Sequence, residues 1–285
     1  MQLFHFSFMV GLLASVSCGI VGSYVVARRI TYIAGGIAHC VLGGIGAARY
    51  MQVVYHWDRF DPLYGALIAG LLAAMVIGVV SLRAKEREDT AISAIWSVGM
   101  ATGILFIWGT PGYSADLQSY LFGSILTVGR SDLMLTGLLG IIVVVCALAF
   151  YQQFVAVCFD EEFSRVRNVR TNFYYLVLLA LTALTVVLLL RVVGIVLVIA
   201  LLTLPAAIAG HFSRTLWQMM GLAILFCAIL TASGVALSIR TDLPAGATIV
   251  VLSGAAYLVV TVGRGVARFW PWRRNGARAV PAAQG

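Results

Sequence analysis

A single histidine, His39, stands within an apolar, glycine-rich stretch of the sequence that is long enough to cross a membrane. An ionisable side chain at membrane depth costs about 2.5–3.5 kcal/mol on insertion scales, so such a residue usually marks a substrate path. Imidazole is a good ligand for zinc, manganese or iron, and it is partly unprotonated at neutral pH. One imidazole makes no tight site, but it suits brief contact with a passing cation, because binding during passage must remain weak enough to release.

The surroundings of His39 predict where its ring points. If residues 31–51 form a helix, Gly35, His39, Gly43 and Gly46 share one stripe at spacings of four, four and three. Small residues let helices approach closely inside a bilayer, so we expect His39 to face other helices rather than lipid. It is then either a hydrogen-bonded core histidine or a residue that lines a pore, and the scarcity of other internal ionisable groups favours the pore. Cys40 lies about 100° further around the helix and is a poor co-ligand.

The remainder of the chain consists of elements that would hold this histidine in a membrane. Of 285 residues, 61% are hydrophobic and 11% are charged, whereas a soluble domain carries about 25% charged residues. Apolar runs of about 20 residues recur, and each fits a bilayer-spanning helix. We predict an all-α polytopic membrane protein with eight or nine transmembrane helices over residues 1–265 and a basic, disordered cytoplasmic tail over 266–285. The nine expected crossings are 7–27, 31–51, 62–82, 91–109, 133–150, 173–190, 192–212, 217–239 and 246–263.

The basic residues predict the orientation. The net charge is +8, but the arginines stand between apolar runs, which is a topology pattern rather than that of a nucleic-acid-binding face. If the N-terminus lies outside, all but five of the 19 basic residues fall on the cytoplasmic side, and the C-terminus is cytoplasmic too. The five exceptions are Arg49, Arg59, Arg130, Arg191 and Arg240.

Two segments between the predicted spans stand out. Residues 117–129 are too short to cross, so they form either a short re-entrant helix on the outer side or an interfacial helix. The loop from Tyr151 to Asn172 is the one long inner loop, and its acidic residues precede its basic ones. This order suits a short helix whose macrodipole is complemented at both ends. Such a helix would either dock a partner or lie at the membrane surface.

The sequence also limits the energy source. There is no G-x-x-x-x-G-K-[ST] motif, and the single lysine, Lys85, cannot supply one, so the chain does not hydrolyse ATP itself. Asp132 is the one carboxylate near an apolar interior, whereas a proton- or sodium-driven carrier usually needs more intramembrane charge. Two mechanisms therefore remain: a passive channel, or a permease driven by a separate ATPase that grips the Asp160–Arg170 loop.

Five short pieces of the sequence, in order, resemble one family. The chain is similar, over about residues 5–265, to the membrane permease subunit of metal-uptake ABC transporters of the ABC-3 type, which serve zinc, manganese or iron. The pieces are Arg28-Arg29 followed by Gly35-Gly36-Ile37-Ala38-His39, then Tyr120-Leu121-Phe122-Gly123, Asp160-Glu161-Glu162-Phe163-Ser164-Arg165-Val166, Leu201-Leu202-Thr203-Leu204-Pro205-Ala206-Ala207-Ile208-Ala209, and Asp242-Leu243-Pro244-Ala245-Gly246-Ala247-Thr248.

The resemblance implies a complex in the inner membrane of a prokaryote. It implies a homodimer of permeases, two cytoplasmic ATPase subunits that bind ATP, and an extracytoplasmic metal-binding protein, with no cofactor held by this chain. The transported ion would be divalent, with zinc the leading candidate and manganese or iron the alternatives. His39, predicted above from its own surroundings to line the metal path, lies within one of the matching pieces. The resemblance assigns coupling to the ATPase to Asp160, Glu161, Glu162, Phe163 and Arg165.

Further expectations concern the entrance and the moving parts. Asp58, Asp61, Asp116 and Asp242 should lie on the outer side, where they would attract cations or contact the binding protein. Pro205 interrupts a helix ladder and is either a hinge or a static kink. Gly35 and Ser124 stand where many relatives carry aspartate, so the identity of the metal stays open. The alternatives to an ATP-driven metal importer are a passive channel or secondary carrier, a similar permease for another substrate such as an iron chelate, and a membrane protein that transports nothing.

Overall fold

The computed structural model describes residues 2–57, 60–83, 88–111, 130–159, 164, 166 and 169–275. Its elements are all helical, as predicted. They are α1 (Gln2–Ala27), α2 (Thr31–Val54), α3 (Pro62–Arg83), α4 (Glu88–Trp108), α6 (Arg130–Ala149), α7 (Tyr151–Phe159), α9 (Thr171–Val193), α10 (Ile195–Phe212), α11 (Leu216–Thr241) and α12 (Ala245–Asn275).

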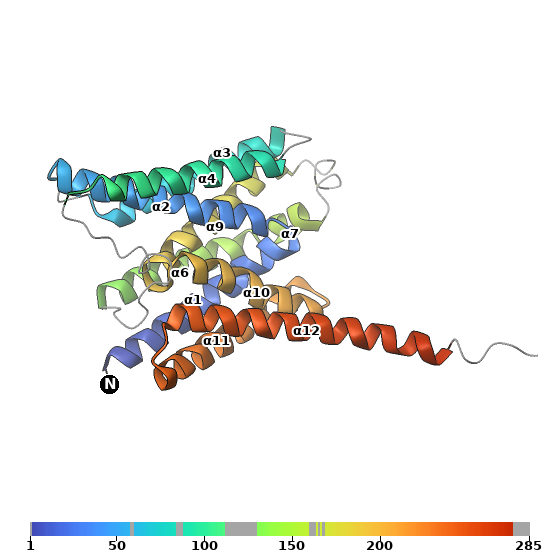
Figure 1. The fold of residues 1–285 in the computed structure, drawn as a ribbon. Coiled ribbons are helices and arrows are strands. Elements are labelled where there is room, and N and C mark those ends of the chain that lie inside the picture. The colour runs from blue at the N-terminus through green and yellow to red at the C-terminus, as the bar shows by residue number, and fades with distance from the viewer. Residues whose placement is uncertain are drawn as a thin grey trace, which may run out of the picture.

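The long helices run roughly side by side in three groups (Figure 1). Helices α2, α3 and α4 pack together at one edge of the bundle, and α1, α10, α11 and α12 pack together at the other. Helices α6, α7 and α9 lie between the two groups, with α9 in contact with α3, α6 and α7. Since α2 also contacts α9 and α10, the helix that carries His39 is enclosed on several sides.

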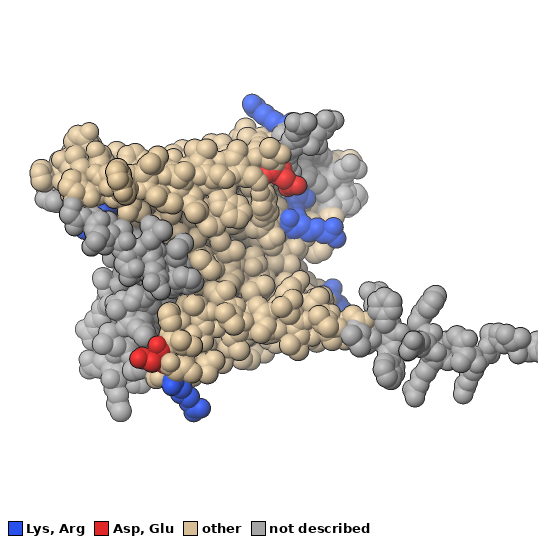
Figure 2. Space-filling view, viewed as in Figure 1, with Lys and Arg blue, Asp and Glu red and all other residues tan. Residues whose placement is uncertain are grey.

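Each of the nine predicted crossings coincides with a helix. Seven helices of the described chain are long and apolar enough to span a membrane, and an eighth span is counted if α6 and α7 are taken as one bent pair. The described apolar part of α1, Gly11–Ala27, is shorter than these. Figure 2 shows the same organisation on one face, where charged side chains lie near the two ends of the bundle and uncharged surface lies between them.

The structure corrects the expected boundary of the inner loop. Residues Tyr151–Phe159 form α7, which meets the end of α6 at an angle of 70°, so the first part of the predicted loop is helical. The predicted loop was wrong there because Gln152 and Gln153 interrupt the apolar run, whereas Phe154 and Val157 are buried where α7 packs against α9 and α1. The expected re-entrant segment, 117–129, lies outside the described residues. Helix α12 continues to Asn275 and so includes the first ten residues of the predicted tail.

Glycines determine how closely α2 packs on its neighbours. A Cβ atom built on Gly46 would lie 2.5 Å from the carbonyl oxygen of Gly103 in α4, and one built on Gly43 would lie 2.8 Å from the oxygen of Gly99. On the α3 side, a Cβ on Gly44 would meet the backbone of Gly65. These helices therefore touch backbone to backbone, which is the close approach that small residues permit in a bilayer.

Candidate metal path and coupling elements

His39 lies near the middle of α2, and its imidazole faces α4. The ring stacks on the indole of Trp96, with 4.5 Å between the ring centroids and 12° between the planes. Tyr32 lies two turns earlier on α2, and its ring centroid is 5.8 Å from that of the same indole. Its hydroxyl shares a hydrogen bond with Ser93 of α4. The expectation that His39 faces another helix is confirmed. Three aromatic rings thus follow one another along the α2–α4 contact.

The imidazole of His39 has an unused polar atom. Its Nδ1 is buried and has no hydrogen-bond partner among the described residues, although the residue as a whole is half-buried. A buried polar group without a partner costs about 1–3 kcal/mol, so its persistence here needs an explanation. Among the described residues, Nδ1 therefore lacks the hydrogen bond that a core histidine would normally make.

Space is available one turn from the imidazole. A Cβ atom on Gly35 would meet nothing within 4 Å, whereas one on the adjacent Gly36 would meet Ile92 at 3.2 Å. Residues four apart on a helix share a face, so the free volume at Gly35 and the ring of His39 lie on the same side of α2. Cys40 is held differently, since its sulfur donates to the carbonyl oxygen of Ile95 at 3.4 Å and would touch any side chain at Gly99.

The described residues contain no preformed metal cluster. No group of three His, Cys, Asp or Glu side chains in the described ranges could hold a metal ion. One imidazole beside open volume is a weak site by ligand count, which is the property that release during passage requires.

Of the four acidic residues expected at the outer mouth, the structure describes two, Asp61 before α3 and Asp242 after α11, and the start of α3 and the end of α11 lie at the same end of the bundle (Figure 1). Asp61 precedes α3, and its Oδ1 accepts a hydrogen bond from the Leu63 amide at 2.8 Å, so it caps that helix. Asp242 ends α11 with a left-handed backbone, at φ 55°, and its side chain is exposed. Asp58 and Asp116 lie outside the described residues.

Within the segment expected to couple to the ATPase, the structure describes residues 164, 166, 169 and 170. Asp160, Glu161, Glu162, Phe163 and Arg165 lie outside the described residues. Of the neighbouring positions, Ser164 is buried and Val166 is 85% exposed. The segment leaves α7 after Phe159 and returns to α9 at Thr171.

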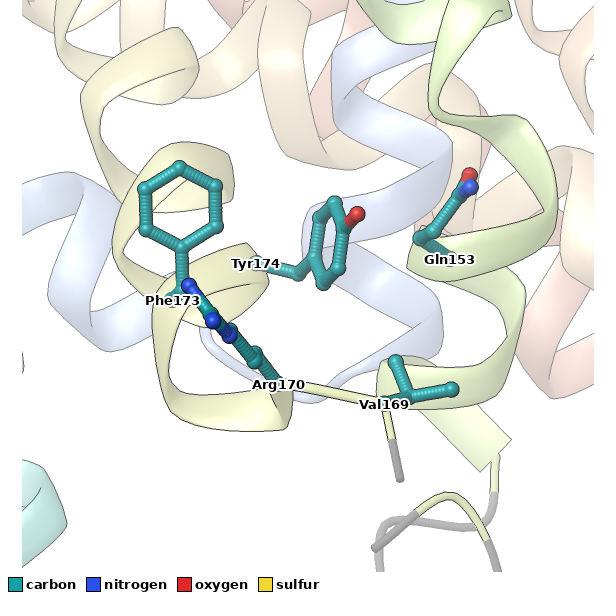
Figure 3. Close-up of a pocket in the computed structure, with 5 residues that line it drawn as sticks. All are labelled: Gln153, Val169, Arg170, Phe173 and Tyr174. Carbon is teal, nitrogen blue, oxygen red and sulfur yellow. The ribbon is translucent and has the colours of Figure 1, made fainter. Parts of the chain in front are cut away.

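A cavity of about 480 Å³ lies between these two flanks, lined by Gln153, Val169, Arg170, Phe173 and Tyr174. In Figure 3, Tyr174 stands between the helices toward Gln153, while the guanidinium of Arg170 extends beside Phe173 and away from Gln153. The polar side chains therefore do not converge on one point in the cavity. The expected hinge, Pro205, is buried within α10.

Comparison with known proteins identifies the architecture. The sequence model of the ABC 3 transport family matches residues 1–264. The chain belongs to the ABC 3 transport family. This match confirms the resemblance drawn from the five sequence pieces, and it covers the whole bundle up to the last turns of α12.

Individual family members are similar over nearly their full length. A protein of Chlamydia pneumoniae, named a probable metal transport system membrane protein, is 39% identical over 251 residues, which are 88% of this chain and 85% of the relative. The manganese transport system membrane protein MntC of Halalkalibacterium halodurans is 30% identical over 96% of this chain and 94% of its own length. Among solved structures, PsaBC from Streptococcus pneumoniae in complex with Fab matches with a TM-score of 0.80 and 28% identity, covering 91% of each chain.

Two residues near the site were not expected from the sequence. Trp96 stacks on His39 across a separation of 57 positions, and an aromatic residue within an apolar run gives no sign of such a contact. Arg28 was interpreted as a topology signal and as part of the family resemblance, and neither interpretation predicts that its guanidinium reaches α7. In both cases the partner lies on a different helix, so periodicity within one helix carries no information about it.

Proposed function

We propose that this chain is the membrane-spanning subunit of an ATP-driven importer for a divalent metal ion. The ion is zinc, manganese or iron, and it passes the face of α2 beside His39. The observation that carries the proposal is the buried Nδ1 of His39, which has no hydrogen-bond partner in the described part of the chain, one helical turn from the open volume at Gly35. Family membership supports the ABC transporter context, and the relatives named for metal and manganese transport support the class of cargo.

The path requires that the ion meets few strong ligands. His39 offers one ring nitrogen, and the stacked indole of Trp96 fixes the plane of its ring. Divalent ions of this class accept imidazole nitrogen as a ligand. The ring therefore orients one ligand toward the ion while water or a second permease copy supplies the others.

Membership of the family supports the proposed complex, and the sequence supports the roles proposed for single residues. Two copies of the permease enclose the path, two cytoplasmic ATPase subunits drive it, and an extracytoplasmic binding protein delivers the metal. The N-terminus lies outside and the C-terminus inside. Asp58, Asp61, Asp116 and Asp242 attract cations at the outer mouth, Asp160–Arg165 contacts the ATPase, and Pro205 permits α10 to bend.

Transport by the reconstituted complex tests the path. We expect His39→Ala to abolish ATP-dependent metal uptake while the complex still assembles, because the ligand is removed without any change in the glycine contacts of α2. Cys40→Ala is the matched control, since its side chain is held against α4, and we expect it to transport normally. Normal uptake by His39→Ala would remove this residue from the path.

The same reconstituted complex, in lipid vesicles, also tests the coupling to ATP hydrolysis and the identity of the transported ion. Replacing Asp160 and Glu161 by lysine should leave little uptake, and full uptake would remove the segment from the coupling role. Uptake by the wild-type complex without ATP would instead indicate a channel or secondary carrier. Parallel measurements with radioactive zinc, manganese and iron, each competed by the other two, assign the ion.

A further inference from the structure

The first turn after α1 is tied to α7 by the side chain of Arg28. Nη1 of Arg28 donates a hydrogen bond of 2.6 Å to the carbonyl oxygen of Val157. Val157 is one of the last four residues of α7, whose carbonyls have no partner within the helix. A cationic donor at this position satisfies one of those carbonyls and complements the negative end of the helix dipole. Arg28 therefore caps α7 two residues before it ends at Phe159.

The same region carries several other cross-links. The hydroxyl of Tyr24 donates to the carbonyl oxygen of Ala147 at 2.9 Å, and the Tyr24 ring meets Phe154 edge-on at 5.2 Å. Ala147 and Phe154 lie on either side of the 70° bend between α6 and α7. The last turn of α1 thus holds the bend from one side, while Arg28 holds the end of α7.

The turn that follows Arg28 joins α1 directly to α2. The amide of Ile30 bonds to the carbonyl of Val25, the amide of Arg29 bonds to that of Val26, and Arg29 has φ 62°. These two bonds and the left-handed residue form a Schellman motif, which fixes the direction of the chain leaving the helix. Helix α2 begins at Thr31, and His39 lies eight residues later, about 12 Å along its axis.

We infer that Arg28 is a positioning residue that transmits movement of the ATPase-facing segment to the helix that carries His39. This inference depends on the proposed function. The segment 160–168 begins directly after α7, Arg28 holds the end of α7, and the fixed turn at Arg29 passes the displacement to α2. The charged hydrogen bond from Arg28 to Val157, together with the covalent path through the turn at Arg29 into α2, connects the two sites.

Tyr175 of α9 also contacts Arg28, and we call the contacts of Arg28 with Val157 and Tyr175 the Arg28 junction. The Arg28 guanidinium lies 5.5 Å from the centroid of its ring, and the Tyr175 hydroxyl shares a 3.0 Å hydrogen bond with Ser81 of α3. A cation over an aromatic face is attracted to it, so the ring orients the guanidinium toward α7. Tyr175→Leu should weaken transmission, whereas Tyr175→Phe keeps the ring and should not.

The test measures metal ions imported per ATP hydrolysed by the full permease–ATPase complex in proteoliposomes. Arg28→Met keeps the volume of the aliphatic stem and removes the donor and the charge. We expect at least a tenfold lower ratio, with the ATP hydrolysis rate within about threefold of wild type. Arg28→Lys, which keeps a charged donor, should restore the ratio to within about threefold. The double variant Arg28→Met with Tyr175→Leu should be no worse than Arg28→Met, because both act through one junction.

Arg29→Asn is the matched control. It removes an adjacent, exposed positive charge, and asparagine tolerates the left-handed backbone at this position. An unchanged ratio in Arg28→Met would overturn the inference, and so would failure of that variant to assemble, since Arg28 would then act in folding. Absence of ATP-dependent uptake by the wild-type complex would instead refute the proposed function.

Discussion

Enlarging Gly46 should separate α2 from α4, while the same change at Gly35 should not. A methyl group at Gly46 would lie 2.5 Å from the Gly103 carbonyl oxygen, whereas ordinary carbon–oxygen contact begins near 3.4 Å. The obstacle is backbone, so the helices must part by up to about 0.9 Å. Overpacking of this kind costs about 1–3 kcal/mol, and the gain in helix propensity from glycine to alanine recovers about 1 kcal/mol.

Gly35→Ala on the same helix is the matched comparison, because its methyl group meets nothing within 4 Å and keeps the full propensity gain. We therefore expect Gly35→Ala to be more stable than Gly46→Ala by about 1–3 kcal/mol. At about 2–4 °C per kcal/mol, this difference amounts to several degrees in the melting temperature. Thermal unfolding of the purified permease in one detergent measures it.

Adding Gly43→Ala to Gly46→Ala should lower the stability by less than Gly43→Ala does alone. Gly43 faces the same helix, and a methyl group there would lie 2.8 Å from the Gly99 oxygen, so a separation forced at Gly46 also relieves Gly43. The double variant should therefore be less destabilised than the sum of the two single changes. Equal melting temperatures for Gly35→Ala and Gly46→Ala, or the reverse order, would refute the close backbone contact between α2 and α4.

Three further predictions concern single side chains. Gly35→Asp places a carboxylate one turn from His39. It should lower the half-saturating metal concentration for uptake by about tenfold relative to the uncharged Gly35→Asn. Equal half-saturating concentrations for the two variants would place the ion elsewhere. Trp96→Ala frees the His39 ring and should reduce uptake by at least fivefold, whereas Trp96→Phe should retain most of it. Tyr24→Phe removes a buried hydrogen bond and should lower the free energy of unfolding by about 1 kcal/mol in denaturant titration, and no change would mean that water replaces the hydroxyl.

The sequence was sufficient to predict the helices because membrane spans are specified by local composition. All nine expected crossings coincide with helices, and the helix around His39 has the predicted bounds to within three residues at its C-terminal end. The 70° bend before α7 was missed, since Tyr151–Phe159, with its two glutamines, is less apolar than the span that precedes it and resembles the start of a loop. A change of direction depends on what the new segment packs against, and here that is Tyr24 of α1 and Arg28 in the turn that follows it.

The candidate path was predictable only in part for the same reason. His39 was distinguished by its residue type and its glycine neighbours, both of which are local. Trp96 and the free volume at Gly35 arise from the packing of α2 on α4 and have no counterpart in either helix alone. Arg28 shows the limit most clearly, because a residue chosen for its charge near the membrane surface also contacts a carbonyl 129 positions away.

The stack of Trp96 on His39 gives the protein an intrinsic optical reporter. Indole emission responds to a neighbouring imidazole, so an ion that reaches the ring would change the fluorescence of one tryptophan out of six. A version of the chain in which the other five tryptophans are replaced by phenylalanine would let arrival of the cargo be timed by stopped-flow, without any attached dye.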